Sequence, residues 1–330
     1  MTILVTGGAG FIGSHLCEHL LASGCRVVCL DNFDDFYNPN VKEQNVADLL
    51  KNNNFGLVRG DIRDEGVLKN IFEKNAVDCV VHLAAKAGVR PSILHPLEYM
   101  SVNVDGTVAL LEAMRKAGVF RFIFGSSSSI YGNQVKTPFS ETDDVSRPIS
   151  PYAASKHSGE LLSYTYHHLY GMDVACLRFF TVYGPRQRPD LAIHKFTQLA
   201  LSGQPIPLYG DGGTRRDYTF VADIVQGISK LIDNKNWRYE VFNLGCGAPV
   251  TLLEMVHAVE QALGKPLEIN FLGKQPGDVE QTHADIRKAQ AFFWLPTFDP
   301  VAGGRTAVCG VVPAEPLKVI NASYDLFTHA

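Results

Sequence analysis

Glycines near the start of the chain constrain its fold more than any other feature. The apolar run at residues 3–5 leads directly into Gly7, Gly10 and Gly13, and residues 11–23 follow with helical apolar spacing. Such glycines let the backbone approach a pyrophosphate at a helix N-terminus, where free N–H groups and the helix dipole favour an anion. A strand, a glycine-rich turn and a helix in this order predict the first unit of a dinucleotide-binding sheet.

The same alternation of strands and helices continues along the first half of the chain. The sequence predicts strands at 26–30, 55–59, 79–83, 121–124 and 174–179, and helices near 66–74, 103–117 and from Pro151 onward. This order predicts an α/β fold with a parallel, doubly wound sheet. Beyond residue 185 the pattern is less regular, so we expect a dinucleotide-binding domain at 1–180 and a smaller α/β substrate domain at 181–330.

Bulk composition narrows the range of partners. The net charge is −4 and there is no long basic run, which argues against nucleic acid or an anionic membrane as a partner. The seven cysteines form no CxxC pair, and residues 1–30 do not resemble a signal peptide, so we expect a cytoplasmic protein. His15 and His19 lie one helical turn apart without a third placed ligand, so we expect no metal site.

Tyr152 and Lys156 lie four residues apart, on one face of the expected helix. The lysine charge favours the phenolate, so we expect it to lower the tyrosine pKa from its reference value near ~10. Such a phenol can take a proton from a sugar hydroxyl while a nicotinamide takes the hydride. The spacing alone is common, but beside a dinucleotide fingerprint it predicts a catalytic pair.

Acidic residues indicate which dinucleotide binds. Asp31 ends the second expected strand, where a carboxylate binds the adenosine ribose hydroxyls. Asp34 and Asp35 follow, and no arginine lies between residues 27 and 58, so a 2′-phosphate would be repelled. The sequence therefore favours NAD over NADP, and Asp61, after the third strand, is a candidate for the adenine edge.

Ordered motifs over residues 1 to about 290 resemble the nucleotide-sugar epimerase and dehydratase group of the extended short-chain dehydrogenases/reductases. They are TGGAGFIG at 6–13, HLAA at 82–85, residues 126–132, YAASK at 152–156, and residues 178–185, 216–218 and 277–279. The resemblance implies a Rossmann-type domain with NAD, a UDP- or dTDP-sugar in the cleft, Tyr152 as base, Lys156 as its tuner, and Ser127 on the reacting hydroxyl. By resemblance, the cofactor-binding residues are Gly7, Gly10, Phe11, Ile12, Gly13, Asp31, Asn32, Asp61, Ile62, Leu83, Ala84, Ala85, Lys86, Tyr152 and Lys156.

The segment before Gly132 narrows the reaction. Family dehydratases carry Thr-Asp-Glu there and UDP-glucuronate decarboxylases keep the Glu, whereas this chain has Ser127, Ser128 and Ser129. Eliminating water requires an acid and a base in addition to the tyrosine, and hydroxyl groups supply neither. What remains is oxidation at C4, rotation of the 4-keto sugar and return of the hydride, which is 4-epimerisation.

Residues 86–92 and 178–190 most resemble UDP-glucuronate 4-epimerases. Arginine suits a bidentate grip on the C6 carboxylate of a glucuronate, and Arg188 is our candidate. The expected substrate-binding residues are Arg90, Ser127, Ser128, Ser129, Thr181, Arg188, Arg216 (diphosphate) and Asp278 (uridine or ribose). UDP-glucose 4-epimerase, UDP-glucuronate decarboxylase and a non-catalytic NAD-sensing protein stay open as alternatives. Helices at 103–117 and 152–170 correspond to those that pair in family homodimers, so we expect a homodimer.

Residues 294–330 depart from the family pattern. The family usually ends in a helix with a Phe-Val-x-Trp-Tyr ending, whereas Gly303, Gly304, Pro313 and Pro316 would break a helix here. Residues 294–312, re-read one base into the Trp294 codon with permitted synonymous codons, give GYRRSTRWLEGVRRFVAWY. Our hypothesis is that a single-base shift near Phe293 replaced the family helix with an out-of-frame tail.

Overall fold

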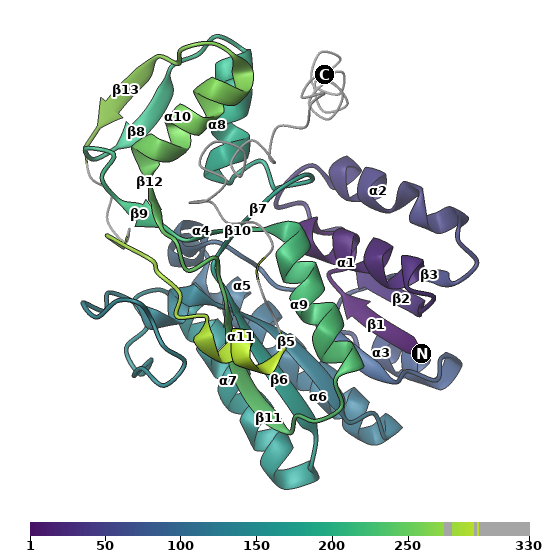
Figure 1. Cartoon of the computed structure of the whole chain (residues 1–330). Helices are drawn as coiled ribbons and strands as arrows, with labels where there is room; N and C mark the ends of the chain where they lie inside the picture. The colour runs from purple at the N-terminus through teal and green to yellow at the C-terminus, as the bar shows by residue number, and fades with distance from the viewer. Residues whose placement is uncertain (274–278, 294–295, 297–330) are drawn as a thin grey trace.

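Seven parallel strands form the central sheet (Figure 1). The computed structural model describes residues 1–273, 279–293 and 296, and all structural statements concern these residues. The strand order β11-β6-β5-β4-β1-β2-β3 confirms the predicted α/β fold with a doubly wound parallel sheet. The strands are β1 (Thr2–Thr6), β2 (Arg26–Asp31), β3 (Phe55–Arg59), β4 (Cys79–His82), β5 (Arg121–Ser127), β6 (Asp173–Phe179) and β11 (Tyr239–Leu244).

Helices cover both faces of this sheet, because its strands are apolar on both sides. Ile3 and Val5 belong to the core shared with α1 and α9, whereas Leu4, between them, belongs to the core shared with α3, α6 and α7. These helices are α1 (Phe11–Ala22), α9 (Val221–Asp233), α3 (Glu65–Lys74), α6 (Gly106–Ala117) and α7 (Pro151–Tyr170). The sheet between two helical layers fixes the positions of the loops at its carboxyl edge.

Local signals explain where the helix carrying Tyr152 begins and ends. The Ser150 hydroxyl accepts a hydrogen bond from the Ala153 N–H, and Pro151 occupies the first turn, where its missing N–H costs nothing. Gly171 ends α7 in the left-handed conformation, with φ of 69°. The predicted helix is confirmed, and its start places Tyr152 in the first turn.

A late segment of the chain returns to the large sheet. The strand β11 pairs in parallel with β6 along its full length, and α9 packs against α1. Because α9 and β11 pack with the first 180 residues, a single domain boundary at residue 180 would separate elements that share one sheet and one core. We therefore propose that residues 1–180 together with 221–244 form the larger domain.

The smaller part has a separate apolar core between α8 (Ala192–Leu201), β8 (Ile206–Tyr209) and α10 (Leu252–Leu263). Phe196, Leu208 and Met255 are among its buried residues. The remaining strands are β7 (Thr181–Tyr183), β9 (Arg215–Arg216), β10 (Tyr218–Phe220), β12 (Val250–Thr251) and β13 (Ile269–Leu272). The sequence analysis assigned neither α8, α9 and α10 nor the four remaining α-helices, which are α2 (Pro39–Ala47), α4 (Val89–Leu94), α5 (Pro96–Met100) and α11 (Arg287–Phe292).

Two predictions fall largely outside the described residues. Asp278 is among the residues not described, as is the proposed out-of-frame tail apart from Pro296. In the part that is described, none of the helices combines the length and apolar character needed to cross a membrane.

Candidate active site

A cavity of about 410 Å³ lies where the loops following the central strands meet the smaller part. Its size is typical of small-molecule sites, and its place at the carboxyl ends of parallel strands is where α/β sheets bind ligands. All fifteen residues predicted to bind the cofactor border it. Five of the predicted substrate residues also border it: Ser127, Ser128, Ser129, Thr181 and Arg188. The structure thus gathers these residues, whose roles stay predictions.

The turn between β1 and α1 has no room for larger side chains. Gly7 has φ of +70°, and a Cβ there would lie 2.7 Å from the Ala84 nitrogen. At Gly13, a Cβ would lie 2.2 Å from the Gly7 carbonyl oxygen. Only glycine fits these positions, and the close turn brings the N-terminus of α1 to the cavity.

Asp31 is 6% exposed at the end of β2. Its carboxylate accepts hydrogen bonds from the Ala9 and Phe33 N–H groups, at 3.1 and 2.9 Å. The Lys42 ammonium lies 3.7 Å from the same carboxylate. These contacts fix the carboxylate at the cavity wall, where each oxygen keeps a further lone pair for a ribose hydroxyl.

Asp61 borders the cavity after β3. Arg63 donates to both of its oxygens at 2.8 Å, and the Asn32 side chain donates to one of them at 3.1 Å. The Arg63 hydrogen bonds lower the Asp61 pKa to about 2. The carboxylate is therefore ionised at neutral pH and is held beside Asn32 and Ile62, two more predicted cofactor residues.

Tyr152 and Ser127 face each other across the end of β5. The Ser127 side chain favours the ionised form of Tyr152, and its hydroxyl donates to the Ser129 hydroxyl at 3.0 Å. The Tyr99 ring meets the Tyr152 ring edge-on, with ring centroids 6.2 Å apart. Packing against Tyr99 therefore holds the Tyr152 ring in the part of the cavity that the three serines also border.

The expectation that the Lys156 charge lowers the Tyr152 pKa was wrong. The Tyr152 pKa is raised rather than lowered, because burial outweighs the hydrogen bond with Ser127 and the charge of Arg188. The cation that lowers this pKa is Arg188. Lys156 instead donates to the Gly125 carbonyl oxygen at 2.7 Å, and its ammonium lies 5.1 Å from the centroid of the Phe124 ring.

Lys156 is 5% exposed, and burial lowers its pKa to about 8, although the nearby Glu160 charge opposes this. Glu160 is itself bound to Arg178 at 2.8 Å and to the Ser126 hydroxyl at 2.6 Å. The lysine is thus held at the base of the cavity beside a buried ion pair, and its ammonium is partly destabilised there.

Arg188 borders the cavity and is already paired. Its Nε and Nη2 atoms donate to the two oxygens of Asp190, at 2.9 and 2.7 Å. The guanidinium also lies over the Phe36 ring, 5.6 Å from its centroid. Asp190 occupies one of the two edges that a guanidinium offers to a carboxylate, and it fixes the plane of the group.

The other predicted substrate residues are placed differently. The Arg90 guanidinium lies over the Tyr209 ring, 5.4 Å from its centroid, and connects α4 with β8. Arg216 donates to the Arg215 carbonyl oxygen. Neither arginine is among the described residues that border the cavity. Their predicted contacts with the sugar nucleotide stay predictions.

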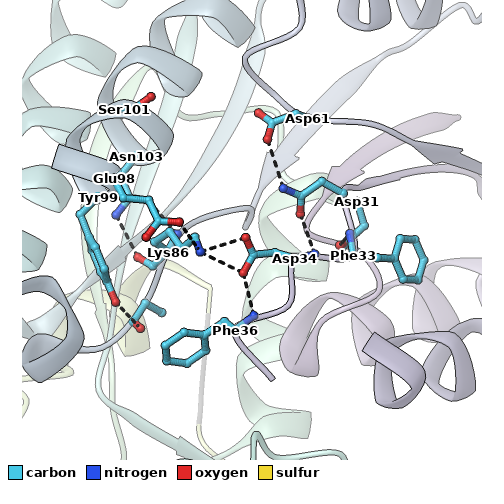
Figure 2. A network of polar contacts seen from close by, with 12 residues as sticks. Asp31, Phe33, Asp34, Phe36, Asp61, Lys86, Glu98, Tyr99, Ser101 and Asn103 are labelled. Carbon is cyan, nitrogen blue, oxygen red and sulfur yellow. Dashed lines mark hydrogen bonds and ion pairs between the residues drawn. The ribbon is translucent and has the colours of Figure 1, made fainter. Parts of the chain in front are cut away.

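The sequence analysis missed a polar network at the mouth of the cofactor site (Figure 2). Lys86 was predicted to contact the cofactor, but not to bind Asp34 and Glu98 at the same time. Tyr99 was missed as well. The signal for both Glu98 and Tyr99 was the short helix α5, which begins with Pro96 and which the sequence analysis left unassigned.

Comparison with known proteins identifies the family of the chain. A family model described as "NAD dependent epimerase/dehydratase family" matches residues 3–245. The chain belongs to this family. The UDP-glucuronate 4-epimerase of Thermodesulfobacterium geofontis is 43% identical to this family member over 295 residues, covering 89% of this chain and 90% of that protein.

Two solved structures have the same fold as this epimerase/dehydratase. UDP-glucuronic acid 4-epimerase from Bacillus cereus, in complex with UDP-glucuronic acid and NAD, has a TM-score of 0.86 and 36% identity, covering 94% of this chain and 99% of that chain. UDP-glucose 4-epimerase from Thermotoga maritima, with UDP-glucose, has a TM-score of 0.86 and 32% identity, covering 98% of this chain and 100% of that one.

The residues of this epimerase/dehydratase fit a dinucleotide. The turn after β1 is possible only with glycine, because a Cβ at Gly7 or Gly13 would clash. This turn brings the N-terminal N–H groups of α1 to the cavity, where they suit a pyrophosphate. The fixed carboxylate of Asp31 suits ribose hydroxyls. A carboxylate at the ribose position would also repel a 2′-phosphate, so NAD fits this site better than NADP.

Proposed function

We propose that the chain is an NAD-dependent 4-epimerase of UDP-glucuronate. The observation that carries this proposal is the set of polar groups around Tyr152. Three serine hydroxyls, Thr181 and the Arg188 guanidinium border this end of the cavity. Among the described residues, the carboxylates that border the cavity are Asp31, Asp34 and Asp61, which follow β2 and β3 at its other end.

This distribution of charge favours epimerisation over dehydration or decarboxylation. A dehydratase requires an acid and a base near C5 and C6 of the sugar, in addition to the tyrosine. No carboxylate of the described cavity lining accompanies Tyr152. The hydroxyls of Ser127, Ser128 and Ser129 can hold a sugar by hydrogen bonds without transferring a proton near neutral pH.

The residues of the chain divide the proposed chemistry. When bound, NAD would supply the acceptor and the later donor for the C4 hydride, so the reaction would involve no net redox change. Tyr152 takes the proton of the C4 hydroxyl as that carbon becomes a ketone, and gives it back when the alcohol re-forms. Ser127 borders the cavity with Tyr152 and orients the sugar hydroxyl, while Lys156 places a positive charge at the base of the site.

Arg188 is the proposed reader of the C6 carboxylate, together with the hydroxyls of Thr181, Ser128 and Ser129. A 4-keto-glucuronate is a β-keto acid, which loses CO₂ when the bond between C5 and the carboxylate lies perpendicular to the plane of the C4 ketone. A guanidinium fixed by Asp190 holds such a carboxylate in one orientation. This protects the intermediate while the sugar presents its other face.

Separate incubations with UDP-glucuronate and UDP-glucose test the proposal. We expect UDP-galacturonate from UDP-glucuronate, at an equilibrium ratio and without net NADH formation. Conversion of UDP-glucose alone would show that this is a UDP-glucose 4-epimerase, and a pentose product would show a decarboxylase. Both substrates left unconverted by NAD-loaded protein would support a non-catalytic role.

The exposed face of α7 supports a homodimer. Leu161, Tyr164 and Leu169 are 57%, 51% and 60% exposed on this helix, which packs beside α6. Exposed apolar side chains along one helix suit a two-fold interface between identical subunits. Light scattering at micromolar concentration should give twice the chain mass, and Leu161→Asp should shift it to the monomer. A monomeric wild-type protein would contradict this assembly.

The cysteines support the proposed cytoplasmic location. The six within the described residues, Cys17, Cys25, Cys29, Cys79, Cys176 and Cys246, are free thiols. Free thiols of this kind persist in reducing compartments. Fractionation of cells that express the protein tests the location directly.

A further inference from the structure

Lys86 connects two walls of the cofactor site. Its ammonium lies 2.9 Å from one Asp34 oxygen and 3.0 Å from the other, and 2.6 Å from Glu98 (Figure 2). The Lys86 side chain is 12% exposed. Burial disfavours its charge, but the bonds with Glu98 and Asp34 outweigh this and raise the Lys86 pKa. The ammonium therefore stays charged, and both ion pairs persist at neutral pH.

The sheet order shows what this connection crosses. Asp34 lies in the loop after β2, and Lys86 lies in the loop after β4. The strand β1 lies between β2 and β4, and the glycine turn follows β1. The bridge from Asp34 through Lys86 to Glu98 thus spans the edge of the sheet at which the pyrophosphate is proposed to bind.

The Lys86 backbone and the residue next to Glu98 are fixed to the fold. The Asn103 side chain accepts from the Lys86 N–H at 2.8 Å and donates to the Lys86 carbonyl oxygen at 2.9 Å. Tyr99, next to Glu98, donates to the Ala87 carbonyl oxygen at 2.9 Å. The Lys86 backbone therefore cannot swing away as a whole, so opening the bridge requires breaking its ion pairs.

On the other side, the loop after β2 is held by local hydrogen bonds. The Asp34 N–H donates to the Asn32 side chain at 3.1 Å, and the Phe36 N–H donates to Asp34 at 3.0 Å. Such Asx turns are modest contacts on an exposed loop. The second ion pair, from Lys86 to Glu98 on α5, holds the lysine against a helix and so stabilises the bridge to Asp34.

We propose that Glu98 is a positioning residue that holds Lys86 across the cofactor cleft and slows release of the bound dinucleotide. The proposal rests on the proposed NAD-dependent function. An epimerase has a chemical need for such a device, because the same cofactor must return the hydride it has taken. If NADH left between the two transfers, the 4-keto sugar would be stranded. A bridge over the pyrophosphate keeps the dinucleotide in place during rotation of the sugar.

The test measures release of NADH from the loaded full-length protein, using its fluorescence and a chase with excess NAD⁺ in the absence of any sugar. Glu98→Gln should release NADH about three- to tenfold faster, the effect expected from losing a half-buried ion pair. Glu73→Gln is the matched control, since Glu73 pairs with Lys69 at 3.7 Å on the exposed face of α3. The control should release NADH at the wild-type rate.

Two further measurements separate this role from a general loss of structure. Salt should speed release from the wild type more than from Glu98→Gln, because screening weakens the pair that the variant already lacks. In a Lys86→Met background, adding Glu98→Gln should have no further effect, since Glu98 acts through Lys86. The proposal would be overturned if Glu98→Gln released NADH at the wild-type rate. It would also be overturned if Glu98→Gln sped release equally in the wild-type and Lys86→Met backgrounds.

No sugar enters these measurements, so they do not depend on which substrate is turned over. If UDP-glucuronate is not converted but release depends on Glu98 as described, the proposed substrate fails and the bridge stands. A wild-type chain that does not retain NADH at all would overturn the bridge.

Discussion

The cavity wall differs between the end proposed for the cofactor and the end proposed for the sugar: the first is mainly backbone and the second is mainly side chains. At the cofactor end, the glycine turn presents backbone, and Asp31 is pinned by two backbone N–H groups. At the sugar end, the wall consists of side chains: serine hydroxyls, a phenol and the Arg188 guanidinium. A contact made by the backbone is altered only if the sheet or its turns shift, whereas a contact made by a side chain is altered by a single substitution. The first end therefore suits one invariant ligand, and the second can be adapted to different sugars.

The largest expected effect tests the sugar end through its base. Tyr152→Phe removes one hydroxyl but keeps the ring that packs against Tyr99. Turnover should fall about 1,000-fold, because the proton acceptor is lost, while NAD binding persists. Measurement of kcat together with the NAD content of the purified protein checks both halves of this statement. Turnover within tenfold of wild type would remove Tyr152 from its proposed role.

The next largest effect tests the cofactor end. Gly13→Ala places a methyl group 2.2 Å from the Gly7 carbonyl oxygen, so the turn must shift. NAD affinity should fall roughly 100-fold, near the upper end of the cost of overpacking, and a titration of NADH fluorescence measures it.

Gly56→Ala is the control for this substitution, because the nearest atom to a Cβ there is 3.9 Å away. If Gly13→Ala bound NADH as tightly as this control, the backbone would not set the cofactor site, and the contrast between the two ends would fail.

Arg188→Ala should sharpen the comparison by changing specificity, beyond a smaller loss that both substrates share because the Tyr152 pKa rises without the Arg188 charge. The value of kcat/KM for UDP-glucuronate should fall about 30-fold, since a buried carboxylate loses its charged partner, and that for UDP-glucose should change much less. Arg186→Ala, which removes a pair with Glu18, is the control. Equal losses on both substrates would show that Arg188 does not read the C6 group.

The smallest expected effect concerns Lys156, which lies between the two ends. Its pKa is about 8 in the folded chain, whereas an unfolded lysine titrates near ~10.4. Between these values the unfolded state binds more protons, so the free energy of unfolding rises with pH. Relative to Lys156→Met, the wild type should gain about 1 kcal/mol from roughly pH 7.5 to 9.

Urea denaturation of both proteins at the two pH values measures this difference. Other groups act in both proteins and cancel, such as Cys79, whose thiol titrates near ~8.5 in the unfolded chain and has its pKa raised to about 12 by burial in the folded chain. An identical pH response in wild type and Lys156→Met would mean that the lysine is not destabilised in the folded chain.

The cofactor end was the more predictable of the two, for a physical reason. Gly7, Gly13 and Asp31 lie within one strand–turn–helix–strand unit, so local sequence determines their arrangement. The gathering of Ser127, Tyr152 and Arg188 depends on the meeting of β5, α7 and the loop after β7, which spacing alone does not reveal. The reversed pKa shift of Tyr152 was missed because burial has no signature in a four-residue spacing.

Contacts between distant segments were also beyond the sequence analysis. The return of β11 to the sheet places residues 239–244 beside β6, and the Lys86 bridge joins three separate segments. The hypothesis of an out-of-frame tail at 294–330 stays a prediction. The coding DNA tests it: the shifted frame near Phe293 must spell the family helix, and any other reading rejects the idea.

The pairing of α1 with α9 has a consequence for how the protein is made. Leu16 and Leu20 of the first helix share their core with Ile224 and Ile228, which emerge from the ribosome roughly 200 residues later. At typical synthesis rates this leaves an apolar helix face uncovered for about 10 to 40 seconds. Part of this apolar face is therefore open to aggregation until α9 is made, and co-expression of a chaperone that shields the first helix should raise the yield of folded protein.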